Sequence, residues 1–504
     1  RPICSRGHRT VQSQHGGRNA RSVAIIGSGP GGLCMGIKLK QAGFENFTIF
    51  EKGSGVGGTW YHNSYPGAAC DIMSHLYSYS FELKTDWSRP YGTQPEIRGY
   101  LEHCAAKYGM GPHLRLNTAV SQAYWDEECQ IWRLVTEHGD EVIADVLVSA
   151  IGMFTDLSWP DIDGMDSFEG TLFHSARWDH DHDLSGERVG IIGSAASAVQ
   201  FVPEIAPIVG RLDLYQRTAN WVLPKADDPY DEATLERFRR DPAEVRQHRL
   251  TIWRDVERFA TFPADLIPRA ERAGLRNLQA VEDPVLRAKL TPTHGYGCKR
   301  PLISNVYYPT FNRDNVELIT ERIERVTPTG IRTVDGTQRD VDTMILATGF
   351  KVSRYLSAVD VRGRGGKPIS EAWDDGAQAY LGITTAGFPN LFMLYGPNTN
   401  GGSSIILMGE YQVAYIMRQL RRMDEEGLVS LEVRRDVMDH YNAVLQEDLA
   451  KMDVWQGDCG NYYRAESGRM VTQYPYSSAT YRNATSKPDP DAFEVGHGLA
   501  YSAR

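Results

Sequence analysis

Short apolar runs rich in β-branched residues alternate along the chain with longer segments of helical periodicity. The runs cover residues 23–26, 47–50, 146–152, 188–192, 212–216 and 344–349. Runs of this length are typical of buried parallel strands. The segments 33–41 and 199–205 each follow such a run and predict helices. Because repeated strand, helix and strand build a parallel sheet, the sequence predicts an α/β fold.

A glycine-rich turn joins the first predicted strand to the first helix. Gly27, Gly29 and Gly32 form the pattern G-x-G-x-x-G, and Glu51 follows the second strand. In this context the glycines permit a tight turn, a close approach of a pyrophosphate and close packing of helix on strand. The acid can accept a hydrogen bond from a ribose hydroxyl. The sequence therefore predicts a dinucleotide site here.

A second, weaker unit repeats this arrangement. It begins with Gly193, Ser194 and Ala195, and Arg217 lies 24 residues after its first glycine, the offset that separates acid from glycine in the first unit. A guanidinium suits a 2′-phosphate where a carboxylate suits a free 2′-hydroxyl, so we expect NADP(H) at the second unit only. The methyl of Ala195 narrows the approach to the pyrophosphate. A helix-packing turn without a ligand is the alternative.

Length, charge and cysteine content exclude several classes of protein. The 504 residues carry 54 Lys and Arg against 64 Asp and Glu, a formal charge of −10, which does not suit nucleic-acid binding. No apolar run approaches the about 20 residues that cross a bilayer. The seven cysteines are scattered without a C-x-x-C, so a disulfide framework, a zinc site and a redox dithiol are not expected. We expect a reduced, cytoplasmic protein of several domains.

Residues 168–179 carry a longer pattern. Phe168, Gly170, His174, Trp178 and Asp179 fill every fixed position of F-x-G-x-x-x-H-x-x-x-W-[PD], just ahead of the second glycine-rich turn. The chain thereby resembles the Baeyer–Villiger monooxygenases, a family of flavin-dependent enzymes. The resemblance covers roughly residues 20–485 and implies two Rossmann-like dinucleotide-binding domains, one for FAD and one for NADP, with an inserted helical subdomain.

The domain order follows from this layout. The expected segments are a tail over 1–21, an FAD-binding domain over 22–157 and 341–485, an NADP-binding domain over 158–230 and 292–340, a helical insertion over 231–291 and a loose tail over 486–504. The run 146–152 is expected to close the first FAD-binding segment, and the run 344–349 to return the chain to that domain. A solvated helical hairpin without a substrate role is the alternative for the insertion.

The resemblance also assigns further residues. The cofactor-binding residues that it adds are Gly58, Thr59, Trp60, Asp71, Thr218, Lys299, Arg300 and Asn398. Thr218 and Lys299 are expected to share the 2′-phosphate with Arg217. His174 and Trp178 are expected at the junction of the two domains rather than in proton transfer. Ala69 departs from the family, many members of which carry Arg there.

The chemistry implied is the conversion of a small-molecule ketone to an ester or lactone with dioxygen and NADPH, through a flavin C4a-peroxide. A peroxide that must stay anionic needs a cation that cannot lose its proton, and arginine is that cation. By position Arg300 is expected to be the catalytic arginine and Asp71 its orienting partner. An N- or S-oxygenating flavin monooxygenase is the alternative. The kind of ketone and the oligomeric state stay open.

Overall fold

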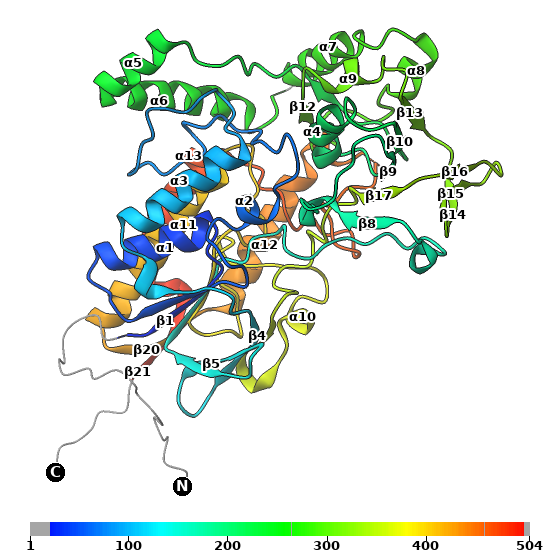
Figure 1. The fold of residues 1–504 in the computed structure, drawn as a ribbon. Helices are drawn as coiled ribbons and strands as arrows, with labels where there is room; N and C mark the ends of the chain where they lie inside the picture. Colours follow the sequence, from blue (N-terminus) through cyan, green and yellow to red (C-terminus); the bar gives the residue numbers. More distant parts are fainter. Residues whose placement is uncertain (1–20, 264, 458, 498–504) are drawn as a thin grey trace, which may run out of the picture.

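The computed structural model describes residues 21–263, 265–457 and 459–497. The tail predicted over 1–21 therefore lies, apart from Arg21, outside the described residues. The chain forms two lobes, each built on a five-stranded parallel sheet (Figure 1). The two sheets are the two predicted dinucleotide-binding units, which confirms the α/β fold.

The first sheet forms the core of the lobe expected to bind FAD, and the second that of the lobe expected to bind NADP; we call them the FAD lobe and the NADP lobe. Its strands, in spatial order, are β19 (Leu391–Met393), β7 (Val146–Ser149), β1 (Val23–Ile26), β2 (Phe47–Phe50) and β3 (Leu114–Arg115). The helices α1 (Pro30–Gln41), α3 (Gln94–Lys107) and α11 (Ile405–Glu425) pack against one face (Figure 1). A sheet of β18 (Asp360–Arg362), β4 (Val120–Asp126), β5 (Ile131–Thr136) and β6 (Glu141–Ala144) covers the other. Because both faces are covered, every residue of β1 is buried.

The second sheet forms the core of the NADP lobe. Its strands are β13 (Val316–Ile319), β10 (Arg211–Tyr215), β9 (Arg188–Ile192), β17 (Thr343–Leu346) and β8 (Thr171–His174), and α4 (Ala196–Ile205) follows β9. The prediction that the run 344–349 returns the chain to the FAD lobe is wrong. Leu346 pairs with Ile192 and His174, so β17 lies inside the NADP sheet and the chain crosses back after it. A short apolar run fits either sheet equally well, so its sequence does not reveal its partner.

The predicted helical insertion is divided between the lobes. It contains α5 (Glu232–Arg240), α6 (Pro242–Phe259), α7 (Leu266–Leu278) and α8 (Pro284–Lys289). Arg249 on α6 donates to the carbonyls of His75 and Ser78 in the FAD lobe. Asn277 on α7 donates to the carbonyl of Val222 in the NADP lobe at 3.2 Å. The helical content is as predicted, but the four helices dock on two different lobes (Figure 1).

The C-terminal segment is more ordered than predicted. After α12 (Arg435–Ala450) and α13 (Ser478–Ser486), β21 (Phe493–His497) pairs antiparallel with β20 (Leu428–Val433). Phe493 is buried beside the helices of the FAD lobe. The prediction of a loose tail over 486–504 is therefore wrong for residues 493–497, because a strand partner far away in sequence overrides the local Pro- and Asp-rich composition. Residues 498–504 lie outside the described residues.

A disulfide joins Cys298 to Cys459. This corrects the prediction that disulfides are absent. The two cysteines are 161 residues apart in sequence, and only the docking of the lobes brings them together. Their spacing along the chain therefore gives no indication that the two cysteines pair.

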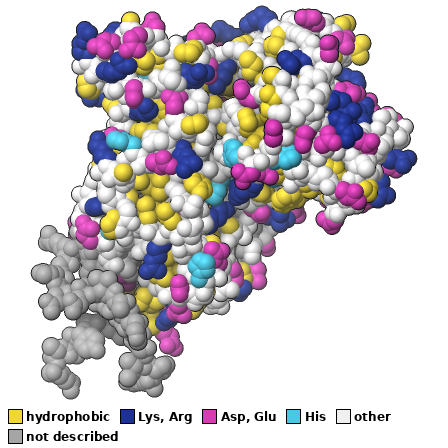
Figure 2. Space-filling model, in the orientation of Figure 1, with side chains coloured by type: hydrophobic (Ala, Val, Ile, Leu, Met, Phe, Trp, Pro, Cys, Tyr) yellow, Lys and Arg dark blue, Asp and Glu magenta, His cyan; other side chains and the backbone are white. Residues whose placement is uncertain are grey.

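The remaining elements are short. They are α2 (Thr59–His62), β11 (Val222–Leu223), β12 (Leu302–Ile303), α9 (Tyr307–Thr310), β14 (Ile323–Thr327), β15 (Gly330–Thr333), β16 (Gln338–Asp340) and α10 (Ile369–Ala372). Among the described residues no helix is both long and apolar enough to span a bilayer. Acidic and basic side chains are intermixed over the face drawn in Figure 2.

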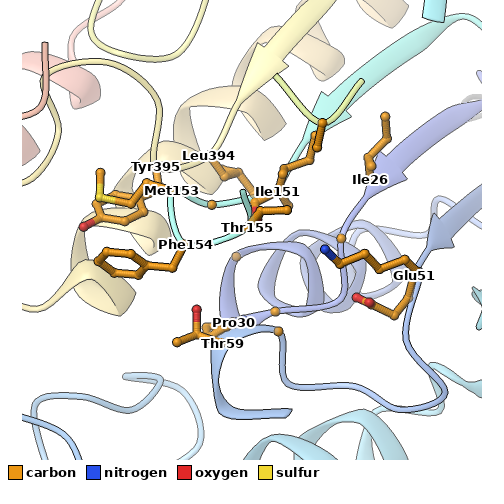
Figure 3. Close-up of a pocket in the computed structure, with 18 of the residues that line it drawn as sticks. Ile26, Pro30, Glu51, Thr59, Ile151, Met153, Phe154, Thr155, Leu394 and Tyr395 are labelled. Atoms are coloured by element: carbon orange, nitrogen blue, oxygen red, sulfur yellow. The ribbon is translucent and has the colours of Figure 1, made fainter. Parts of the chain in front are cut away.

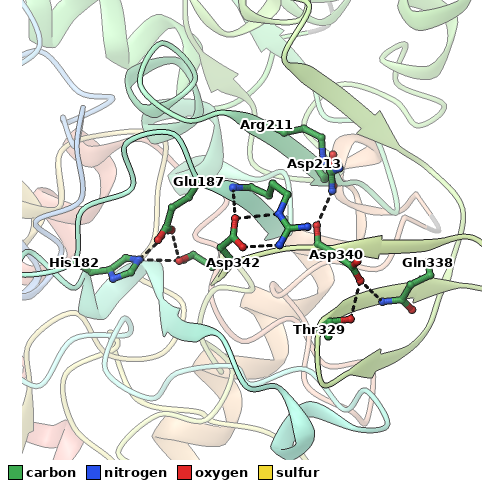
Figure 4. A network of polar contacts seen from close by, with 10 residues as sticks. His182, Glu187, Arg211, Asp213, Thr329, Gln338, Asp340 and Asp342 are labelled. Carbon is green, nitrogen blue, oxygen red and sulfur yellow. Dashed lines mark hydrogen bonds and ion pairs between the residues drawn. The ribbon is translucent and has the colours of Figure 1, made fainter.

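A polar network ties together the starting ends of the NADP-lobe strands (Figure 4). Arg188, which begins β9, donates from Nη2 to Oδ1 of Asp342 at 2.6 Å and from Nε to Oδ2 at 3.1 Å. Thr343, which begins β17, donates to Glu187 at 2.6 Å. These bonds hold the register of β9 and β17 at the end of the sheet remote from the glycine-rich turn.

Candidate functional site

A cavity opens at the carboxyl ends of β1, β2 and β7 (Figure 3). It holds about 1170 Å³ free of protein atoms, counted out to its open mouth. The predicted residues that line it are Gly27, Gly29, Glu51, Gly58 and Thr59. The carboxyl ends of parallel strands are where nucleotides bind in folds of this class. The structure therefore brings together most of the residues predicted to bind the first dinucleotide.

The glycines of this cavity are required by close backbone contacts. Gly27 has φ +104°, and a Cβ added to it would lie 2.5 Å from the carbonyl oxygen of Ala150. A Cβ on Gly32, which lies beneath the turn, would meet the oxygen of Gly27 at 1.9 Å. A Cβ on Gly58 would lie 2.8 Å from Cα of Gly29. The floor of the cavity is therefore bare backbone at the start of α1, as a pyrophosphate site requires.

Glu51 is held as a carboxylate at the edge of the cavity. It is 5% exposed and accepts from the backbone N–H and the hydroxyl of Ser28, at 2.9 and 2.8 Å, and from the N–H of Gly53 at 2.8 Å. Burial raises the pKa of Glu51, but the His62 ring and these donors outweigh burial and lower the pKa to about 2. An ionised carboxylate with spare lone pairs suits a ribose diol.

The second glycine-rich turn repeats the geometry of the first. Gly193 has φ +108°, and an added Cβ would lie 2.4 Å from the carbonyl oxygen of Ala347. A Cβ added to Gly27 would meet the carbonyl oxygen of Ala150 in the same way. Ala195 is the N-cap residue directly before α4; it is exposed, and its side chain makes no capping hydrogen bond. Ala150-Ile151-Gly152 and Ala347-Thr348-Gly349 thus occupy equivalent places after β7 and β17. This repeated Ala-x-Gly is present in the sequence and could have indicated that β17 corresponds to β7.

The equal offsets of Glu51 and Arg217 do not mark equivalent positions. The N–H of Gly27 donates to the carbonyl of Phe50, whereas that of Gly193 donates to Tyr215. In this register the residue that corresponds to Glu51 is Gln216, and Arg217 stands one place further on. Ile26 pairs with Phe50 and Ile192 with Tyr215, so the crossover from the first strand to the second is one residue shorter in the second unit.

Arg217 nevertheless stands just after β10, where a 2′-phosphate is expected, and within electrostatic range of Lys299. Arg217 is exposed at the end of β10, with Thr218 beside it. Burial lowers the pKa of Lys299, and the neighbouring charge of Arg217 lowers it further. Among the described residues neither cation forms an ion pair with a carboxylate. Two adjacent cations without an acidic partner are suited to a doubly charged anion.

Arg300 and Asp71 form an ion pair between the lobes. Arg300 donates from Nε and from Nη2 to the same Asp71 oxygen, Oδ2, at 2.9 and 2.5 Å. The two side chains are 37% and 36% exposed. Asp71 raises the pKa of Arg300 well above its usual value, against the opposing effect of burial. The predicted pair is thus in contact, and its guanidinium is permanently charged.

Two tyrosines beside Arg300 were not predicted. Tyr395 lines the cavity of Figure 3, and burial raises its pKa while the charge of Arg300 opposes that rise. Tyr462 also lies close to Arg300, and burial raises its pKa while the charge of Arg300 opposes that rise. No local pattern in the sequence distinguishes Tyr462 from the neighbouring packing tyrosines. Tyr395 is thus within electrostatic range of Arg300, which does not itself line the cavity.

Among the residues of the long pattern, His174 has contacts that lead towards the FAD lobe. His174 ends β8, packs against Phe350 and Trp159, and accepts from the N–H of Ala176 at 3.1 Å. Burial lowers its pKa to about 4, so the ring is neutral at pH 7. Phe350 in turn contacts Phe154 of the cavity wall. A neutral, packed histidine agrees with the predicted junction role.

The other members of this pattern make contacts within the NADP lobe, so a junction role for Trp178 stays a prediction. Trp178 packs on Phe201 of α4 with ring centroids 5.2 Å apart. Gly170 permits a close approach, since an added Cβ would lie 2.4 Å from the oxygen of Asp342 and 2.5 Å from the Phe168 ring. Asp179 accepts from the N–H of a residue two places later in its loop.

Gln200 fastens a loop of the FAD lobe to α4. Its amide oxygen accepts from the hydroxyl of Tyr65 at 2.9 Å, and its nitrogen donates to the carbonyl of Ala69 at 2.9 Å. Ala69 is the position where the chain departs from its family, and its backbone, not its side chain, makes this contact. Gln200 was not predicted.

Two predicted cofactor residues are engaged in packing. Trp60 is buried and donates from Nε1 to the Tyr77 hydroxyl at 3.1 Å. The amide nitrogen of Asn398 donates to the carbonyls of Met470 and Gln473, at 2.9 and 3.0 Å. Its oxygen is buried and accepts no hydrogen bond from the described residues. Contact of either residue with a cofactor stays a prediction.

Comparisons with known proteins agree with this geometry. Residues 24–246 match the family described as pyridine nucleotide-disulphide oxidoreductase. A Baeyer–Villiger monooxygenase of Pseudomonas aeruginosa is 43% identical, over 94% of this chain and 91% of its own length. One from Streptomyces coelicolor is 42% identical, over 94% and 92%. The structure of an oxidized steroid monooxygenase bound to NADP superposes with a TM-score of 0.86 at 31% identity, covering 95% of this chain and all of that one.

Proposed function

The chain belongs to the Baeyer–Villiger monooxygenase family, and on that premise we propose that it inserts one oxygen atom of dioxygen beside the carbonyl of a small ketone. The product is an ester or lactone, FAD is the resident cofactor and NADPH the reductant. The observation that carries this assignment is the Arg300–Asp71 pair, which joins the two dinucleotide-binding lobes.

The residues of the FAD lobe fit the flavin nucleotide. The bare backbone of Gly27, Gly29 and Gly58 leaves room that any Cβ would fill, and the first turn of α1 offers uncapped N–H groups to the pyrophosphate. The ionised Glu51 accepts from the ribose. When bound, the flavin passes electrons from NADPH to dioxygen and supplies the oxygen atom that is inserted.

Arg300 stabilises the negative charge that develops on oxygen during the insertion. A guanidinium has five N–H donors, and Asp71 engages two of the groups that carry them, Nε and Nη2. The donors that neither Asp71 nor Tyr462 engages are left for the reacting oxygen. Asp71 aims the guanidinium and keeps its pKa far above neutrality, so the positive charge persists at every working pH.

Arg217 and Lys299 select NADPH in the second unit. Their charges compensate the 2′-phosphate, which NADH lacks, and the exposed position of Arg217 leaves it free to grip two phosphate oxygens. Gly193 and the uncapped start of α4 hold the pyrophosphate, with the Ala195 methyl at its edge. His174 stays neutral and positions the lobes, without a proton to transfer.

A parallel assay of one ketone and one thioether tests this function. Purified protein with FAD and NADPH is expected to convert the ketone to a product heavier by one oxygen atom, identified as an ester by mass spectrometry. Sulfoxide formation beside the ester is compatible with the proposal. Sulfoxide without any ester across a panel of linear, cyclic and aromatic ketones would contradict it and favour heteroatom oxygenation.

A further inference from the structure

We propose that Cys298 and Cys459 are positioning residues for this reaction, because their disulfide fixes the Lys299–Arg300 segment of the NADP lobe against the segment of the FAD lobe that carries Tyr462. The bond immediately precedes both cations in sequence. The inference rests on the proposed function of Arg300 and Lys299. It assigns a chemical role to two cysteines that take no part in oxygen transfer themselves.

The two segments touch at the level of the backbone. The Cα atoms of Cys298 and Cys459 are 6.3 Å apart. Gly297, at φ +86°, lies so near Val454 that an added Cβ would come within 2.2 Å of its Cγ2 atom. An added Cβ on Gly457 would lie 2.8 Å from Sγ of Cys298. Glycines on both sides thus admit the close approach in which the sulfurs meet.

A polar contact supports the covalent one. The side-chain nitrogen of Asn461 donates to the carbonyl of Cys298 at 2.9 Å, and its oxygen accepts from the N–H of Tyr463 at 2.9 Å. Asn461 therefore connects the residue before Lys299 to the residue after Tyr462. The disulfide and this amide form two adjacent ties between the same segments.

The segment that holds the cations needs such ties. Residues 297–300 belong to no helix or strand, so no repeating hydrogen bonds fix their conformation. Lys299 and Arg300 are also adjacent in sequence, but their side chains extend towards different lobes. Lys299 lies beside Arg217 in the NADP lobe, where the two like charges repel, and Arg300 reaches Asp71 in the FAD lobe. A fixed Cys298 sets the point from which the two side chains diverge.

Reduction of the native bond gives the first test. A dithiol such as dithiothreitol converts the disulfide to two thiols and is itself oxidised to a cyclic disulfide, with two electrons and two protons transferred. Reduced holoenzyme is expected to show a several-fold higher KM for NADPH and less ester per NADPH consumed, with FAD retained. Reoxidation is expected to restore both values.

Variants make the assignment specific. Cys298→Ser and Cys459→Ser should each reproduce the reduced enzyme, and the double variant should be no worse than either, because both remove the same bond. Dithiothreitol should not change the double variant, which separates this bond from any other reducible group. Cys104→Ala, which removes a free buried thiol of the FAD lobe, is the matched control and should keep the wild-type ratio of ester to NADPH.

Several outcomes would overturn the inference. Unchanged KM and coupling in reduced wild-type enzyme would do so, even where the variants fail to fold. Alkylation of both Cys298 and Cys459 before reduction, detected by peptide mass spectrometry, would also do so. Normal cysteine variants together with an inactive Arg300→Ala leave the proposed function standing and reject only this inference, whereas an active Arg300→Ala rejects the proposed function.

Discussion

Arg300 donates two hydrogen bonds to one oxygen of Asp71, although the two residues belong to different lobes and lie 229 positions apart. The pair therefore exists only when the NADP lobe is docked on the FAD lobe. Gln200 and the Cys298–Cys459 bond join the same two lobes nearby. The cation that the chemistry requires is thus a product of domain assembly.

Replacement of Arg300 should abolish oxygen insertion more than cofactor binding. Arg300→Ala is expected to lower the rate of ester formation by roughly 10²–10³-fold, the usual cost of a lost preorganised donor, while the purified protein stays yellow with FAD. Arg300→Lys is the control that keeps the charge but loses the forked donor, and should recover only part of the rate. Product formation is measured by gas chromatography, and a wild-type rate in Arg300→Ala refutes the role.

The cation pair of the second unit should set the preference between nicotinamide cofactors. Arg217→Ala and Lys299→Ala are each expected to reduce the ratio of kcat/KM for NADPH to that for NADH by about 10–100-fold, since a charge-assisted bond contributes about 1.5–3 kcal/mol. The value for NADH should change little. Arg332→Ala, at an ion pair on β15, is the control. A ratio equal to wild type in both variants argues against this site.

Glu51 should stabilise the FAD lobe except in strong acid. Its pKa is about 2 in the folded chain against 4.5 in the unfolded one, so its contribution of about 3 kcal/mol is complete above pH 4.5 and is lost as the pH falls towards 2. Glu51→Gln should lower the free energy of unfolding at pH 7, with a difference that shrinks below pH 4.5. Urea titrations of both flavin-free proteins between pH 7 and 3.5 measure this. A difference that grows in acid contradicts the assignment.

Ala195, the residue directly before α4, should limit the affinity for NADPH. Ala195 occupies the place that Gly29 holds in the first unit, and its methyl stands exposed at the helix start. Ala195→Gly should lower the KM for NADPH, because the backbone N–H groups become more accessible to the pyrophosphate. Ala196→Gly, one residue into the helix, is the neighbouring control. Steady-state kinetics with an equal or higher KM in Ala195→Gly would show that the methyl is harmless.

The turns and strands could be predicted from the sequence because each is determined by residues that are neighbours along the chain. The glycines at 27 and 193 adopt positive φ in turns that few other residues tolerate. The β-branched runs beside them form the strands β1, β2, β9 and β10, and the observed bounds of these strands lie within one or two residues of the predicted ones. The pattern over 168–179 indicated the family for a related reason, since all its fixed positions lie within one continuous segment.

By itself, then, the amino-acid sequence determined the two nucleotide-binding turns, the α/β class and the identity of the candidate cation. Only the tertiary structure decided that β17 completes the NADP sheet, that Gln216 rather than Arg217 corresponds to Glu51, and that Cys298 bonds to Cys459. Each of these depends on contacts between segments far apart along the chain. Such contacts are selected by the packing of whole sheets and lobes, and no window of neighbouring residues encodes them.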